Sequence, residues 1–79
     1  MKYVRVVPGS NVNLTCVGVG MTNPRVEWMY DGKVIKNSGS QVLQVLDIRE
    51  SRNYTCLAMS GAKTIPATFV LIVEILTYS

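Results

Sequence analysis

The sequence predicts an all-β sandwich, and three observations support that fold class. Short runs rich in Val, Ile, Leu, Thr and Tyr alternate between apolar and polar residues with the period of a half-buried strand. Clusters of turn-forming residues separate these runs at short intervals, at 8–11, 22–24, 31–33, 37–40, 49–51 and 60–63. No stretch carries a sustained helical period. The runs are therefore expected to be the strands of a sandwich or a barrel.

Length and composition limit the chain to one small folded domain. Of its 79 residues, 48% are hydrophobic and 16% are charged, which excludes a disordered segment. We expect one domain over residues 1–79, with a strand core from about 3 to 74. A core of this size supplies only about 3–5 kcal/mol of stability, so a covalent staple is expected. Cys16 and Cys56 are the candidates for it.

Two strands are expected in the first half of the chain, over 11–16 and 25–30. Alternate residues of each run are apolar or aromatic, so they point to one face of a pleated strand. The predicted inner residues are Val12, Leu14 and Cys16 in the first run, and Val26, Trp28 and Tyr30 in the second. The first cysteine and the only tryptophan therefore face the core.

Two further strands are expected over 53–59 and 67–73. The same alternation assigns their inner faces. The predicted inner residues are Tyr54, Cys56 and Ala58 in the first run, and Ala67, Phe69, Leu71 and Val73 in the second. The second cysteine thus faces the core as well.

The positions of cysteine, tryptophan and tyrosine decide between a sandwich and a barrel. A disulfide joining two packed sheets, with a tryptophan against it, is the pattern of the immunoglobulin fold, a Greek-key sandwich. Cys16, Trp28 and Cys56 fit this pattern, and Leu14 adds to the core signature. Tyr54 lies two residues before the second cysteine, where a tyrosine hydroxyl of this fold bonds the backbone. The alternative is two unrelated buried thiols in a cytosolic domain.

Two Asn-x-Thr triplets are candidate N-glycosylation sites. Asn13 and Asn53 begin them, and both asparagines fall on outward strand positions. A domain with a disulfide belongs to an oxidising compartment, where such sites are modified. We expect at least one of the two to carry a glycan.

Several segments resemble one receptor family. The most specific are PGSNVNLTCVGVG, VEWM and VLQVLDIRESRNYTCLAMS, and the resemblance covers roughly residues 8–60. They are similar to the third immunoglobulin domain of the LAR-type (type IIa) receptor protein tyrosine phosphatases. The short segment between the DGK turn and VLQVL resembles an intermediate (I-set) immunoglobulin domain. The resemblance implies a modular receptor with immunoglobulin and fibronectin type III domains, a membrane span and cytoplasmic phosphatase domains. It also implies an ectodomain that binds adhesion proteins and proteoglycans.

The chain offers no chemistry of an enzyme, a metal site or a cofactor site. It contains no histidine, and both cysteines are assigned to the disulfide. The five acids are scattered, and the phosphatase nucleophile motif is absent. Glu50 precedes the second cysteine by six residues, where either a supporting salt bridge or a surface charge is plausible. We expect a fragment with no catalytic residues, no metal and no cofactor.

The outward strand positions predict a contact surface. Five large apolar residues are expected on the solvent face of one sheet: Met29, Leu57, Met59, Val70 and Ile72. Such a face exceeds the single scattered hydrophobe that needs no explanation. We expect it to pack against a protein ligand, a neighbouring immunoglobulin domain or a second copy in a homodimer. The alternative is that flanking residues of the domain, particularly the tail, fold over part of it.

Charge and hydropathy limit the partners and the location. The net charge is +3, and the eight cations are never adjacent, so no nucleic-acid partner is expected. The start of the chain turns polar too soon for a signal peptide, and the apolar tail is too short for a spanning helix. We expect a fragment from the extracellular part of a single-pass plasma-membrane protein, with no direct membrane insertion and with Met1 an artificial start.

Three functional classes remain open at this point. The first is a binding and adhesion module of a cell-surface receptor. The second is a structural spacer that sets the reach and angle of its neighbours. The third is an intracellular I-set domain of a muscle protein, whose cysteines would stay reduced. Free-thiol counting separates the third class from the others.

Overall fold

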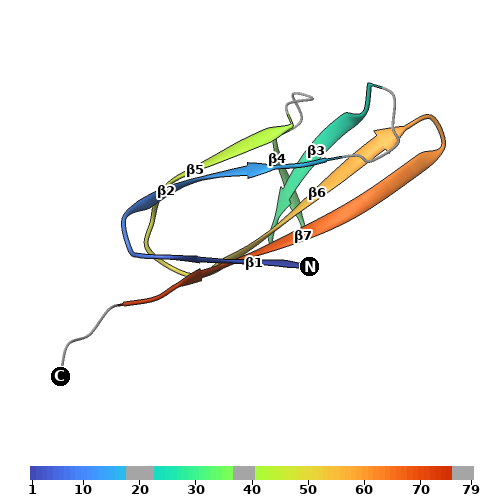
Figure 1. Cartoon of the computed structure of the whole chain (residues 1–79). Helices are drawn as coiled ribbons and strands as arrows, with labels where there is room; N and C mark the ends of the chain where they lie inside the picture. Colours follow the sequence, from blue (N-terminus) through green and yellow to red (C-terminus); the bar gives the residue numbers. More distant parts are fainter. Residues whose placement is uncertain (18–22, 37–40, 76–79) are drawn as a thin grey trace.

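The computed structural model describes residues 1–17, 23–36 and 41–75, which form two packed sheets (Figure 1). The strands are β1 (Lys2–Val6), β2 (Ser10–Thr15), β3 (Arg25–Tyr30), β4 (Lys33–Lys36), β5 (Val42–Ile48), β6 (Arg52–Ser60) and β7 (Lys63–Val73). The larger sheet has the order β1-β7-β6-β3-β4, and the smaller one consists of β2 and β5. The predicted all-β sandwich is confirmed. Across the described ranges, no helix has the length and apolar character that a membrane crossing requires.

Strand pairing is antiparallel except at one edge of the larger sheet. There β1 runs parallel to β7, with Lys2 opposite Phe69 and Val6 opposite Val73. The alternation of apolar and polar residues does not mark this strand or its partner. The last strand was predicted to begin at residue 67, whereas β7 starts at Lys63 and continues through Pro66. The pairing with β1 begins only at Phe69, so β7 is an edge strand at Pro66 and tolerates a residue without an N–H there.

The core lies between the two sheets and uses the predicted inner faces. Every inner residue named from the alternation is either buried or packed against the buried cluster. The smaller sheet adds residues from β5, which the sequence analysis did not assign to the core: Leu43, Val45 and Ile48. The described residues include no buried polar or charged residue, so apolar burial is the main stabilising contribution.

One disulfide joins the two sheets. It links Cys16, directly after β2, to Cys56 in the middle of β6, with the two Cα atoms 6.2 Å apart. Trp28 lies opposite Cys56 in the β3–β6 register and is fully buried. Its ring centroid is 5.8 Å from that of Phe69. The disulfide, the indole and the phenyl ring therefore form the centre of the sandwich.

Tyr54 is buried, but its hydroxyl has a different partner from the one expected. The sequence pattern predicted a hydrogen bond to the backbone, whereas the hydroxyl oxygen accepts a hydrogen bond from Nη1 of Arg52 at 3.1 Å. Arg52 lies two residues earlier on β6, so its side chain starts on the same face as Tyr54. The guanidinium also lies over the Tyr30 ring, 5.7 Å from its centroid. The partner of the Tyr54 hydroxyl oxygen is therefore a side chain and not the backbone of a turn.

Candidate functional site

The outer face of the five-stranded sheet carries the predicted contact residues. β3, β6 and β7 are neighbours in this sheet, as the inner residues predicted. All five apolar candidates alternate with core residues on these strands, so they point away from the core. Each is half-buried, because the side chains beside it on the same face cover part of it.

The strand register divides these five residues into two groups. Leu57 and Met59 are two residues apart on β6, and Met29 on β3 lies diagonally across from Leu57. Diagonal neighbours on one sheet face are within reach of long side chains. We call Met29, Leu57 and Met59 the β3–β6 cluster. Val70 and Ile72 lie further along β7 and form a separate pair.

Polar residues separate the two groups. Thr55 is opposite both Met29 and Thr68, and the two threonine hydroxyl oxygens are 3.4 Å apart. Val70 is opposite Asn53, not opposite an apolar residue of β6. The predicted surface is therefore two apolar areas with a polar row between them.

The N-terminal strand adds residues to the Val70 end that the sequence analysis missed. Tyr3 of β1 is opposite Val70, and Arg5 is opposite Ile72. Arg5 forms an ion pair with Glu74 at 3.5 Å, and both side chains are largely exposed. The alternation in the first strand places Tyr3 outward, but only the parallel pairing with β7 shows which residues it joins.

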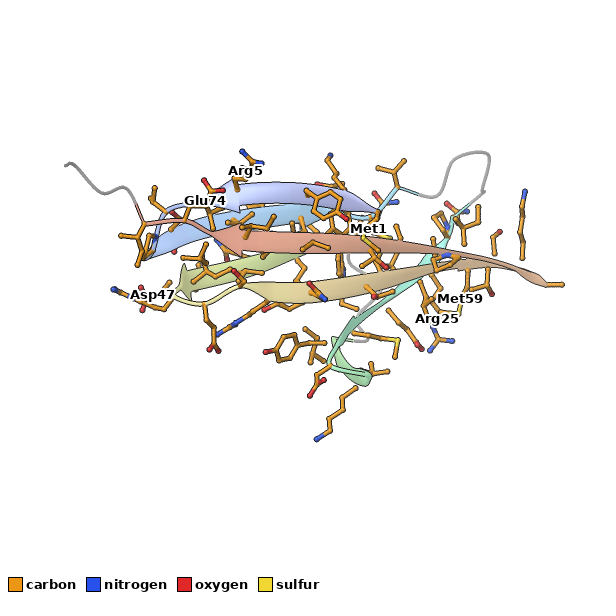
Figure 2. All side chains as sticks on the ribbon, turned by 90° about the horizontal axis from the view of Figure 1, so that it is seen from below. Met1, Arg5, Arg25, Asp47, Met59 and Glu74 are labelled. Atoms are coloured by element: carbon orange, nitrogen blue, oxygen red, sulfur yellow. A yellow bond between two sulfur atoms is a disulfide. The ribbon has the colours of Figure 1, made fainter. Side chains whose placement is uncertain are left out.

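Figure 2 shows the length of this face. Arg25 and Met59 lie together at one end of the sheet, and Arg5 and Glu74 lie toward the other end. This agrees with the register, in which Arg25 is opposite Met59. The β3–β6 cluster thus lies toward the Arg25 end of the face, where Arg25 and Glu27 are its direct cross-strand neighbours. The alternative, that the tail folds over part of the face, concerns residues beyond 75, which lie outside the described residues.

A surface hollow of about 580 Å³ lies where the β3–β4 turn meets the start of β6. Its lining includes Met29, Asp31, Arg52, Asn53 and Thr55. The turn has Asp31 at φ 53° and Gly32 at φ 75°, the left-handed conformation that aspartate and glycine tolerate in a two-residue hairpin. The hollow borders the β3–β6 cluster through Met29 and is open to solvent.

Arg52 is the charged group of this hollow with the most contacts. The hydrogen bond to Tyr54 raises the pKa of the Arg52 guanidinium, and partial burial opposes that rise. The guanidinium therefore stays protonated at every ordinary pH. Its Nε atom is buried and has no hydrogen-bond partner. Glu50 lies 3.8 Å from Nη2 with an exposed side chain, so the predicted acid acts mainly as a surface charge.

The two predicted glycosylation asparagines lie on different sheets. Asn13 is exposed on β2 opposite Gln44, and Asn53 is exposed on β6 opposite Val70. A glycan on Asn53 would extend from the rim of the hollow, next to the Val70 end of the outer face. A glycan there would leave the opposite end of the face, with Met59, open.

The acidic side chains do not gather into a metal-binding group. Within the ranges that the structure describes, no three of His, Cys, Asp and Glu lie close enough to hold an ion. Most acidic side chains there instead pair with arginine at the surface, such as Asp47 with Arg49 at 2.9 Å. The chemistry that the described surface offers is therefore that of contact between apolar side chains and hydrogen-bonding groups.

Comparison with known proteins identifies relatives over most of the chain. A family profile described as "Immunoglobulin domain" matches residues 1–60. The chain is 40% identical over 74 residues to the receptor-type tyrosine-protein phosphatase S of Gallus gallus, with 87% of the chain covered. It is 46% identical over 68 residues to the receptor-type tyrosine-protein phosphatase F of Danio rerio, with 80% covered. It is 40% identical over 74 residues to the tyrosine-protein phosphatase Lar of Drosophila melanogaster, with 87% covered. The chain spans only 4–5% of the length of these relatives.

Solved structures agree on the fold. The human titin domain ZIg10 superposes with a TM-score of 0.68 at 22% identity, covering 99% of this chain and 74% of that one. A chimeric titin Z1Z2, functionalised with a KLER peptide from decorin, gives a TM-score of 0.67 at 23% identity, covering 92% of this chain and 86% of that one. At this identity the likeness shows the shared fold alone.

Proposed function

Because the chain belongs to the immunoglobulin domain family, we propose that it is an extracellular binding and adhesion module from the ectodomain of a LAR-type receptor protein tyrosine phosphatase. The similarity to receptor-type phosphatases over most of the chain supports the receptor. The domain itself is not catalytic; the catalytic domains of those relatives lie elsewhere in their chains. In this proposal the module contributes contact surface and no chemistry.

The observation that carries the binding role is the β3–β6 cluster on the outer face of the five-stranded sheet. Leu57 has Met59 two residues along β6 and Met29 diagonally across on β3. The charged residues Glu27 and Arg25 lie directly opposite Leu57 and Met59 and border the cluster. Flexible methionine side chains adapt to the shape of a partner, and leucine supplies buried apolar area on contact. The partner is a protein ligand or a neighbouring immunoglobulin domain of the same ectodomain.

N-glycans are proposed at Asn13 and Asn53, in keeping with an extracellular location. The Asn53 glycan would shield the Val70 end of the face and direct the partner to the β3–β6 cluster. A mass decrease after endoglycosidase treatment of the secreted protein tests the modification. The absence of any mass shift at both sites would reject it.

The experiment on binding uses the secreted chain, displayed as a multimer and screened against a panel of cell-surface and secreted ectodomains. We expect Leu57→Asp to abolish binding to any partner found, because it buries a carboxylate in the contact. Val17→Asp is the control, because Val17 is an exposed apolar residue beyond the end of β2, outside this face. Binding that survives Leu57→Asp with the fold intact would contradict the proposal, and a screen without partners would favour a spacer.

A further inference from the structure

The start of β6 lies beside a step in the outer face of the five-stranded sheet. On one side, Asn53 is opposite Val70 of β7. On the other side, β3 ends at Tyr30, opposite Tyr54, so the strand does not continue as far as Asn53. The β3–β4 turn borders the space instead, and the hollow of about 580 Å³ occupies it. Asn53 is therefore part of the wall of this hollow.

Hydrogen-bonding groups line the hollow. The Thr55 and Thr68 hydroxyl oxygens are 3.4 Å apart, longer than a good hydroxyl hydrogen bond, so Thr55 can bond a ligand as well. Ser51 Oγ accepts the Val73 N–H at 3.0 Å, which leaves its hydroxyl hydrogen to donate elsewhere. The volume lies within the range of about 300–1,000 Å³ that is usual for small-molecule sites. The hollow thus has the size and the polar groups of a ligand site.

The charges of the hollow favour a neutral ligand. Asp31 and Arg52 are the charged residues of its described lining, one of each sign. Glu50 lies 3.8 Å from Nη2 of Arg52 and adds a second carboxylate nearby. An anion that approached the guanidinium would therefore meet like charges as well. A neutral molecule with several hydroxyl or amide groups fits better.

Met29 adds an apolar contact to these polar groups. Its side chain is half-buried on the outer face and lines the hollow. A sugar ring has hydroxyl groups around its rim and C–H groups on its faces, so it needs contacts of both kinds. A methionine side chain adapts to the shape of such a ring. The lining therefore suits a neutral sugar with an acetamide group.

We propose that the hollow holds the first N-acetylglucosamine of an N-glycan attached to Asn53. This inference rests on the modification of Asn53 proposed above. The sugar is bonded to the Asn53 side-chain nitrogen, so its point of attachment lies in the wall of the hollow. Attachment removes much of the entropic cost of binding, so weak contacts are enough to hold the ring. The ring contacts Met29 and the turn at Asp31, and the further sugars leave through the open side.

This position keeps the glycan at one end of the outer face. Leu57 and Met59 lie two and four residues beyond Thr55 along β6, away from the hollow. The seated sugar therefore borders the β3–β6 cluster at Met29 and leaves its other two residues open. The glycan and a protein partner can then share the face.

Asn13 provides a comparison within the same chain. It borders a smaller hollow of about 220 Å³, whose lining is mostly apolar and includes Val4, Val12 and Phe69. Sugar hydroxyl groups placed there would lose hydrogen bonds to water without gaining enough partners. We therefore expect the first sugar on Asn13 to stay mobile, whereas the first sugar on Asn53 is held.

Nuclear magnetic resonance of the secreted chain tests the seat of the sugar. Asn13→Gln leaves the glycan on Asn53, and an endoglycosidase trims it to a single N-acetylglucosamine. With methyl-labelled methionine, we expect nuclear Overhauser effects between the sugar protons and the Met29 methyl group, but not the Met59 methyl group. The control is Asn53→Gln, which keeps the sugar on Asn13; relaxation should show that sugar to be more mobile. Contacts to Val70 in place of Met29, or equal mobility of the two sugars, would overturn the proposal.

Urea denaturation measures what the seated sugar contributes. In the Asn13→Gln chain, the single sugar on Asn53 should lower the unfolding equilibrium constant about fivefold relative to Asn53→Gln, as one net hydrogen bond would. Asp31→Gly preserves the turn, because glycine tolerates φ 53°, and should reduce this factor to about twofold. Asp47→Gly is the matched control: it replaces another aspartate at positive φ, on the smaller sheet, and should leave the factor unchanged. A factor that Asp31→Gly does not reduce would contradict the seat.

Failure of this inference can be told apart from failure of the binding role. Both measurements use the glycosylated chain without a partner, so a partner screen that finds nothing leaves their outcome unchanged. Secreted protein without any glycan on Asn53 would overturn the inference together with the proposed modification. That result would leave the β3–β6 cluster as a contact surface.

Discussion

The two sheets of this sandwich are stabilised in different ways. In the five-stranded sheet, β7, β6 and β3 each have a neighbour on both sides, and the sheet holds the large buried rings of Trp28, Tyr54 and Phe69. In the smaller sheet each of the two described strands has only the other as its neighbour, and their buried residues are aliphatic: Leu14, Leu43, Val45 and Ile48. Since two strands alone are marginal in water, the smaller sheet depends on what it contacts.

Two connections hold the smaller sheet to the larger one. The first is apolar contact across the core, and the second is the disulfide from Cys16 to Cys56. A local irregularity adds a third, internal support: Asp47 has φ 49°, and its N–H donates to Oδ1 of Asn11 at 3.0 Å. One layer is therefore a five-stranded platform. The other, among the described residues, is a two-stranded layer held in place by its contacts with that platform.

The largest expected effect comes from Trp28, which lies on β3 and packs in the core between the two sheets. Trp28→Ala removes a fully buried indole and should cost about 3–5 kcal/mol, enough to unfold a domain of this size. Far-UV circular dichroism during urea denaturation measures this, because the variant lacks the fluorescent residue. Val34→Ala, on the exposed edge of β4, should change stability by less than about 0.5 kcal/mol. A denaturation midpoint close to that of the unsubstituted chain would contradict the central role of Trp28.

The second-largest effect, removal of the disulfide, should reveal a difference in stability between the two sheets. Replacing Cys16 and Cys56 together by alanine opens a link with a sequence separation of 40 and should cost about 3–4 kcal/mol. Because β2 and β5 pair only with each other among the described strands, their amides should lose hydrogen-exchange protection before those of β6 and β7. An equal loss of protection in both sheets would show that they unfold as one unit, with no difference in stability between them.

The inner faces were predictable, because alternation alone assigns them. Val26, Trp28 and Cys56 are buried as the period of two requires, and the disulfide follows from their spacing in this fold. The grouping on the outer face was not predictable, because alternation gives the direction of a side chain but not its neighbours. Only the register shows that Asn53, and not an apolar residue, lies beside Val70.

Two other features needed three-dimensional information for different reasons. β1 pairs with β7 from the opposite end of the chain, and a five-residue run contains nothing that names so distant a partner. The hydrogen bond from Arg52 to Tyr54 joins residues two apart, which alternation places on one face. However, a cation at the start of a strand is ordinarily solvent-exposed, so its partly buried position was not expected.

The smallest expected effect is the difference between two arginines, the partly buried Arg52 and the exposed Arg49. Arg52→Met removes the hydrogen bond to Tyr54 and the contact with the Tyr30 ring, and it also removes the buried Nε that lacks a partner. The gains partly offset the losses, so a net cost of about 1 kcal/mol is expected. Arg49→Met removes an ion pair with Asp47 whose side chains are 69% and 65% exposed, and should cost less than about 0.5 kcal/mol. Urea denaturation of the two variants side by side measures the difference. Equal costs would mean that the Arg52 contacts contribute no more than a surface charge, and that the five-stranded sheet needs no side-chain support for its buried tyrosine.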